Sequence, residues 1–142
     1  MRDRLTLSAV ALPGILLGLA AATPLPHPRQ QNPLPAGVTD SLIETGRRYF
    51  LGEGRCHTCH GADGKGGLGP NLTDRAWLHG TGTFEEIVQR VGTGVPAEQS
   101  RSGQVMPPRG GSSLDPEQIR AVAAYVWRLS HRPERRSSDD DQ

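Results

Sequence analysis

The sequence predicts a small all-α, loop-rich domain built from about three to four short helices. Segments with apolar residues at helical spacing alternate with glycine- and proline-rich stretches in which regular structure cannot continue. Only 4% of the 142 residues are aromatic, so the chain's own side chains would make a thin core. We therefore expect the helices and loops to wrap around a large apolar group that completes this core.

One short motif predicts what that group is. Residues 56–60 read Cys-His-Thr-Cys-His, the C-x-x-C-H pattern through which a c-type haem is attached. Two thiols one helical turn apart can each add to one vinyl group at the haem edge, and His60 is then positioned to bind the iron. We expect one covalently bound haem c, attached through Cys56 and Cys59, with His60 as an iron ligand.

Other uses of a C-x-x-C pair agree less well with this sequence. A thioredoxin-like redox pair belongs beside a βαβ pattern, and the sequence shows none. A structural zinc site needs a second pair of ligands, whereas these two cysteines are the only ones in the chain. A disulfide across two intervening residues closes almost no loop and would stabilise little.

Residues 1–22 have the form of a signal peptide. Arg2 and Arg4 precede a long apolar run, and the small residues Ala20–Ala22 follow it as a cleavable end. An uncleaved N-terminal anchor is the alternative, because the apolar stretch is about long enough to span a bilayer. We expect the domain outside the cytoplasm, in the periplasm or an equivalent compartment, and at a membrane only if this segment is retained.

The rest of the chain divides by composition. Residues 23–38 are predicted to be a proline-rich linker, residues 39–130 the folded haem domain, and residues 131–142 a disordered polar tail that includes His131. The formal net charge is +1, which gives no reason to expect a nucleic-acid partner.

Two capping patterns place the first two long helices. Ser41 with Glu44 three positions later predicts a helix over residues 41–51. Within it, Gly46 costs stability relative to alanine, so either another helix approaches closely at this position or the glycine simply weakens a short helix. Thr83 with a glutamate three positions later predicts a second helix over residues 84–91, which Gly92 would end.

The last helix is predicted to start at Asp115, a capping aspartate followed by proline. It carries an apolar stripe of residues spaced to face one side. The stripe is Ile119, Val122, Ala123, Val126 and Leu129.

Met106 is the candidate for the second axial position of the iron. It is the only methionine apart from the initiator, and it lies in a glycine- and proline-rich loop before Pro107 and Pro108. A methionine there is better explained as a ligand than as core filler, and a thioether ligand suits electron transfer. His79 is the other candidate, although a turn residue or a neighbour of a haem propionate describes it better.

The ordered motifs resemble the class I monohaem cytochrome c family over about residues 40–130. The resemblance rests on Gly46 and Phe50, Cys56-x-x-Cys59-His60, Gly69-Pro70-Asn71-Leu72, Met106-Pro107 and Tyr125. It implies a cytochrome c-like fold in which the first and last helices cross at Gly46 and Phe50 lies against Tyr125. It also implies that the Pro70 carbonyl is the hydrogen-bond partner of His60.

A second resemblance involves the run from Gly69 to Gly80. This run is similar to haem domains of the dihaem subunit of cbb-type haem–copper oxidases, although the sequence contains only one attachment motif. By this likeness Trp77 lies near a haem propionate.

These observations predict an electron carrier rather than an enzyme. No catalytic triad, carboxylate pair or second metal cluster is visible in the sequence. The iron would cycle between Fe(II) and Fe(III) as redox partner proteins donate and accept electrons. Two alternatives remain open, namely a haem-bearing electron-accepting subunit of a periplasmic dehydrogenase or oxidase, and an open-site haem protein that binds small ligands.

Overall fold

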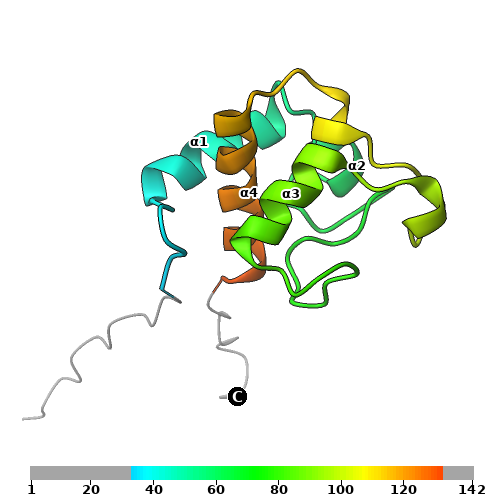
Figure 1. Ribbon diagram of the computed structural model, residues 1–142, viewed down its shortest axis with the longest axis horizontal. Coiled ribbons are helices and arrows are strands. Elements are labelled where there is room, and N and C mark those ends of the chain that lie inside the picture. The colour runs from blue at the N-terminus through cyan, green and yellow to red at the C-terminus, as the bar shows by residue number, and fades with distance from the viewer. Residues whose placement is uncertain (1–32, 133–142) are drawn as a thin grey trace, which may run out of the picture.

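The computed structural model describes residues 33–132, and its regular structure is helical (Figure 1). The elements in chain order are α1 (Asp40–Leu51), α2 (His57–His60), α3 (Phe84–Thr93), the 3-10 turns η1 (Ala97–Gln99) and η2 (Pro108–Gly111), and α4 (Pro116–Ser130). The strand-like pairing found in this part of the chain is an isolated bridge between Val95 and Met106. The predicted all-α, loop-rich fold is confirmed.

The N-terminal segment 1–22 lies outside the described residues, as do residues 23–32 of the linker and 133–142 of the tail. Leu34 and Val38, from the end of the predicted linker, pack against the hydrophobic core, and Val38 is 6% exposed. Between residues 33 and 132, no helix has the length and apolar character needed to cross a membrane.

Helix α1 begins at Asp40, and its cap, Thr39, lies two residues before the predicted cap, Ser41. Thr39 is extended, with φ −124° and ψ 160°, and its hydroxyl accepts a hydrogen bond of 3.1 Å from the Leu42 N–H. Ser41 already lies in the first helical turn, and Glu44 forms an ion pair with Arg47 instead of reaching back (Nη2–Oε1 2.9 Å). The capping box at Ser41 was therefore wrong, because the threonine before an acidic first-turn residue is the better cap.

The crossing of α1 and α4 explains the glycine in α1. A Cβ atom at Gly46 would clash with the carbonyl oxygen of Ala121 and lie 3.0 Å from Cβ of Tyr125. One turn further along, the rings of Phe50 and Tyr125 meet edge to face, with centroids 5.2 Å apart. Both contacts confirm the helix crossing that the cytochrome c resemblance implies.

Helix α3 starts as predicted and ends later. Thr83 and Glu86 form the full capping box. The helix then runs through Gly92 and stops at Gly94, whose φ of 73° is left-handed and therefore favours glycine. Gly92 has no heavy atom near its missing side chain, so neither packing nor backbone requires a stop there.

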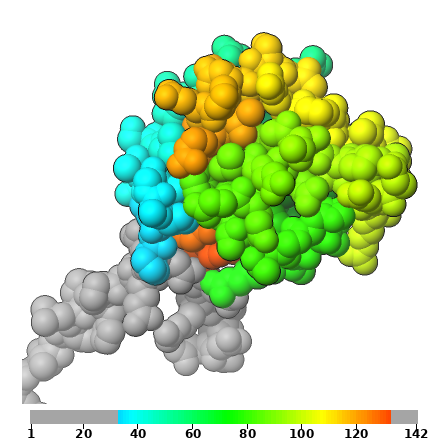
Figure 2. Space-filling model, in the orientation of Figure 1, coloured from blue at the N-terminus to red at the C-terminus, as the bar shows by residue number. Residues whose placement is uncertain are grey.

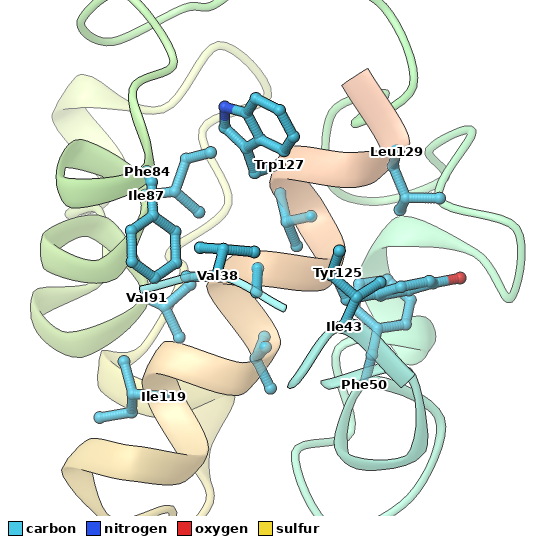
Figure 3. Packing of buried hydrophobic residues seen from close by; sticks show 14 of the residues in the cluster. Val38, Ile43, Phe50, Phe84, Ile87, Val91, Ile119, Tyr125, Trp127 and Leu129 are labelled. Atoms are coloured by element: carbon cyan, nitrogen blue, oxygen red, sulfur yellow. The ribbon is translucent and has the colours of Figure 1, made fainter. Parts of the chain in front are cut away.

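Helix α4 forms the centre of the core. Figure 3 shows its buried side chains between those of α3, including Phe84, Ile87 and Val91, and those of α1. The cap at Asp115 is confirmed, since its carboxylate accepts hydrogen bonds of 2.9 Å from the N–H groups of the residues two and three positions later. The predicted apolar stripe is buried throughout.

His131 departs from the expectation of a solvated tail residue. Its ring stacks on that of Trp127 with centroids 4.2 Å apart and an interplanar angle of 11°. Its Nδ1 lies 2.9 Å from the Trp127 carbonyl oxygen. His131 therefore packs on the C-terminal end of α4 and does not belong to a solvated tail.

Candidate haem-binding site

The attachment motif forms a single helical turn. Cys56 precedes α2, and the His60 N–H donates to the Cys56 carbonyl at 3.0 Å, which closes the turn over the motif. Both thiols are free and both line the same cavity. Burial raises the pKa of Cys56 to about 11, so this thiol is neutral at physiological pH.

The cavity has a volume of about 600 Å³, within the range of protein sites for small ligands and cofactors. Its walls are α2, the glycine-rich loop that follows, α3 and the segment around Met106. The core supplies an apolar floor, which consists of Phe50, Ile87, Val91, Val122 and Val126. This cavity is the space that the large apolar group expected from the sequence would fill.

His60 is held in one orientation at the cavity. It is 7% exposed, and its Nδ1 lies 3.0 Å from the Pro70 carbonyl oxygen. That oxygen can only accept, so Nδ1 carries the hydrogen and Nε2 keeps the lone pair that could bind a metal. Burial lowers the pKa of His60 and so favours the neutral imidazole, the form that binds metals.

The glycine-rich loop after the motif encloses His60 with its backbone. The N–H groups of Gly66 and Gly69 donate to the carbonyls of His60 and Cys59, at 2.8 and 2.9 Å. A Cβ atom at Gly69 would lie 2.8 Å from Cε1 of the imidazole. The loop can therefore approach the ring this closely because Gly69 has no side chain.

Met106 is fixed to the end of α3 through its backbone. Val95 and Met106 exchange two hydrogen bonds of 2.8 and 2.9 Å. A Cβ atom at Gly94 would clash with the Met106 carbonyl oxygen. The side chain is half-buried and lines the cavity that His60 also lines.

Trp77 and His79 lie at the same cavity. A Cβ atom at Gly82 would clash with the indole ring of Trp77, so this glycine allows the indole to approach the chain just before α3. The structure thus brings all six predicted site residues to one cavity. They are Cys56, Cys59, His60, Pro70, Trp77 and Met106.

Sequence reasoning missed two contributors to this site. Val95 anchors Met106 through the bridge, and Arg90 lines the cavity from α3. Neither residue belongs to a motif, and only the apolar spacing of α3 hinted at which of its faces would be buried.

Paired thiols, a buried imidazole and a thioether around an apolar cavity are the donor set that suits a c-type haem. Together with the helical fold, this site defines a cytochrome c-type domain. The model of the family described as cytochrome c oxidase, cbb3-type, subunit III matches residues 42–126, and the chain belongs to this family.

Known proteins similar in sequence to this chain include subunits of cbb3-type cytochrome c oxidases. The cbb3-type cytochrome c oxidase subunit CcoP of Rubrivivax gelatinosus is 43% identical over 89 residues, which are 62% of this chain and 26% of that protein. Subunit FixPc of Rhizobium leguminosarum bv. viciae is 42% identical over 81 residues, 55% of this chain and 28% of that protein. The chain thus spans about a quarter of the length of these relatives.

One solved structure has a similar fold. Cytochrome CL from the marine methylotrophic bacterium Methylophaga aminisulfidivorans MPT superposes with a TM-score of 0.51 at 24% identity. The match covers 63% of this chain and 55% of that one. This likeness supports the cytochrome c-like fold and nothing further.

Proposed function

We propose that this chain is a monohaem electron-transfer protein in which Cys56 and Cys59 would hold the haem and His60 and Met106 would bind its iron. The observation that carries the proposal is the cavity to which the structure brings both thiols, the imidazole and the thioether. When bound, the haem supplies an iron that accepts and gives up one electron.

The residues around the cavity have separate tasks in this proposal. The Pro70 carbonyl fixes the ring of His60 and increases the basicity of the ligating nitrogen. The thioether of Met106, as an iron ligand, would raise the reduction potential and would keep small molecules from binding the iron. The apolar floor excludes water from the iron, which also tunes the potential.

Family membership supports a further part of the proposal, which concerns the partners of this domain. The relatives are named as subunits of cbb3-type oxidases, so we propose that this domain passes electrons to or from a larger oxidoreductase assembly. The signal-like segment 1–22 supports a site of action outside the cytoplasm.

Spectroscopy of the ferric protein tests the ligand set. Haem that stays with the protein after acid–acetone extraction establishes covalent attachment. The near-infrared sulfur-to-iron band is expected in wild type, lost in Met106→Ala and retained in His79→Ala, which alters the other cavity candidate. Absence of the band in wild type would remove Met106 as ligand and favour an open sixth position.

A further inference from the structure

The segment that carries Met106 is held at both of its ends. Upstream, the bridge to Val95 joins it to the end of α3. Downstream, η2 brings the chain to the start of the attachment motif, where Gly110 lies against Gly54. A Cβ atom at Gly110 would lie 2.8 Å from the Gly54 carbonyl oxygen, which is too close for a carbon atom. The two backbones can therefore meet only because Gly110 has no side chain.

The Gly54 carbonyl is also the neighbour of a thiol in the attachment motif. Cys56 Sγ lies 3.4 Å from the same oxygen. Gly54 is buried, and its N–H donates to the Tyr49 carbonyl at 2.9 Å, which ties it to the end of α1. This side of the contact is therefore fixed to the core, and a displacement there would be taken up by the turn at Gly110.

The turn at Gly110 has a backbone conformation that favours glycine. Residues 109–111 follow one another with φ of 59°, 66° and 75°, all in the left-handed region. This conformation costs free energy at Arg109, which has a side chain, and such strain persists where the surrounding contacts impose it. Here the Ser112 N–H and hydroxyl both donate to the Arg109 carbonyl. The Gly110 N–H donates to the Pro107 carbonyl at 3.0 Å, so the turn is bonded to the residue directly after the methionine.

We propose that Gly110 positions the Met106 thioether relative to the attachment motif by seating this turn on Gly54. The proposal deepens the electron-transfer function proposed above and rests on it. A short path of contacts joins the two halves of the site, through Cys56, Gly54, Gly110, Pro107 and Met106. A seated turn would keep the thioether at the iron, whereas a turn lifted from Gly54 would let it move away and leave the iron open to small molecules.

Gly110→Ala tests the seating in the ferric holoprotein. The variant should lose most of the near-infrared sulfur-to-iron band, and its reduction potential should fall, since a methionine ligand raises that potential. Added imidazole should bind the iron about tenfold more tightly, because the thioether competes with it less.

Gly111→Ala is the matched control for Gly110→Ala. It places alanine in the same left-handed turn, but its Cβ would lie 3.4 Å from Cγ of Pro107, an ordinary contact, and not against a carbonyl. This variant should keep the wild-type band, potential and imidazole affinity.

A milder pair of variants decides the question if Gly110→Ala does not retain haem. Ser112→Ala removes one hydrogen bond that holds the left-handed turn, and it should raise the imidazole affinity about twofold or more. Ser113→Ala, at the exposed neighbour, should leave the affinity unchanged.

Equal bands and equal imidazole affinities in Gly110→Ala and Gly111→Ala would overturn the role of Gly110 alone. Where the serine pair is used, equal affinities in its two variants would do the same. A wild-type protein with covalent haem but without the near-infrared band would instead overturn the ligand assignment of Met106, and the role of Gly110 with it.

Discussion

Gly69 shows how one missing side chain can help to fix the orientation of His60, the imidazole proposed as an iron ligand. Its backbone lies against the imidazole of His60, and the next residue, Pro70, accepts the hydrogen bond from that ring. The glycine and the proline carbonyl therefore fix the ring together, one by allowing close approach and the other by bonding. Sequence reasoning identified the bond through resemblance but not the reason for the glycine.

Gly69→Ala should displace the ring and weaken its bond to Pro70. The new Cβ would lie 2.8 Å from Cε1 and 2.9 Å from Nδ1, so the ring or the loop must shift by a few tenths of an ångström. A weaker bond makes the imidazole a poorer electron donor, and the reduction potential should rise. An unchanged potential would show that the loop gives way without cost to the ligand.

Glu86 makes the stability of the α3 start depend on pH. Hydrogen bonds from the Thr81 and Thr83 backbone hold the pKa of Glu86 below its ordinary value of 4.5. The carboxylate is therefore stabilising above pH 4.5, and its contribution is lost as the pH falls through the lower folded-state pKa.

Glu86→Gln should lower the free energy of unfolding at neutral pH and have less effect at acid pH. The neutral amide is a weaker acceptor than the carboxylate, so the difference from wild type should shrink below pH 4.5. Urea unfolding at a series of pH values measures this. Glu85→Gln, at the exposed neighbour, should show no such dependence.

At the scale of elements, two helical glycines have opposite consequences. Gly46 faces the backbone of α4 at the crossing, whereas Gly92 has open space around it. The same substitution to alanine therefore tests packing at one position and helix propensity at the other.

Gly46→Ala should destabilise the protein by about 1–3 kcal/mol or more, because the new methyl group meets the carbonyl of Ala121 and the helices must separate. Gly92→Ala should be neutral or stabilise by up to about 1 kcal/mol. Thermal unfolding of both variants beside wild type measures the two effects. A destabilised Gly92→Ala and an unaffected Gly46→Ala would reverse this interpretation.

Local chemistry accounts for the parts of the fold that were predictable. Asp115 and Thr83 were identified because a capping side chain and its partner lie within one turn of each other. Thr39 and Ser41 offer two caps two residues apart, and capping spacing alone does not choose between them; the structure uses Thr39, which places Asp40 in the first turn. His131 was misjudged for a related reason, since its stacking on Trp127 requires the completed end of α4.

The candidate site likewise contains residues that local sequence patterns predict and residues that only the folded structure reveals. Cys56, Cys59 and His60 follow from spacing within one motif, and Met106 from its place in a stiff loop. Arg90 and Val95 matter because of what the folded chain brings near them. No local pattern distinguishes such residues from ordinary surface or core positions.

For the molecule as a whole, we expect folding to depend on the group that fills the cavity of about 600 Å³. Several side chains of the hydrophobic core, including Phe50 and Val126, also line that space. A chain of this size has little spare core to offset an unfilled cavity.

Replacing both thiols, as in Cys56→Ala with Cys59→Ala, should therefore remove fixed tertiary structure as well as the visible absorbance of the haem. The variant without attached haem should lose its near-ultraviolet circular dichroism and unfold with a broad transition, while keeping part of its helical signal. Thr58→Ala, between the two cysteines, should retain the haem and a sharp transition. A haem-free variant that unfolds as cooperatively as wild type would contradict this dependence.

The bridge between Val95 and Met106 has a consequence for how this surface can change. The residues between Val95 and Met106 form a loop whose two ends are joined by this bridge. The loop projects from the molecule at the right of Figure 2, in yellow-green to yellow. Insertions or deletions within this loop should change its shape but not the backbone position of Met106, which the two hydrogen bonds to Val95 hold. The protein can thus vary the shape that it offers to other molecules beside the haem site while the backbone position of its proposed ligand stays constant.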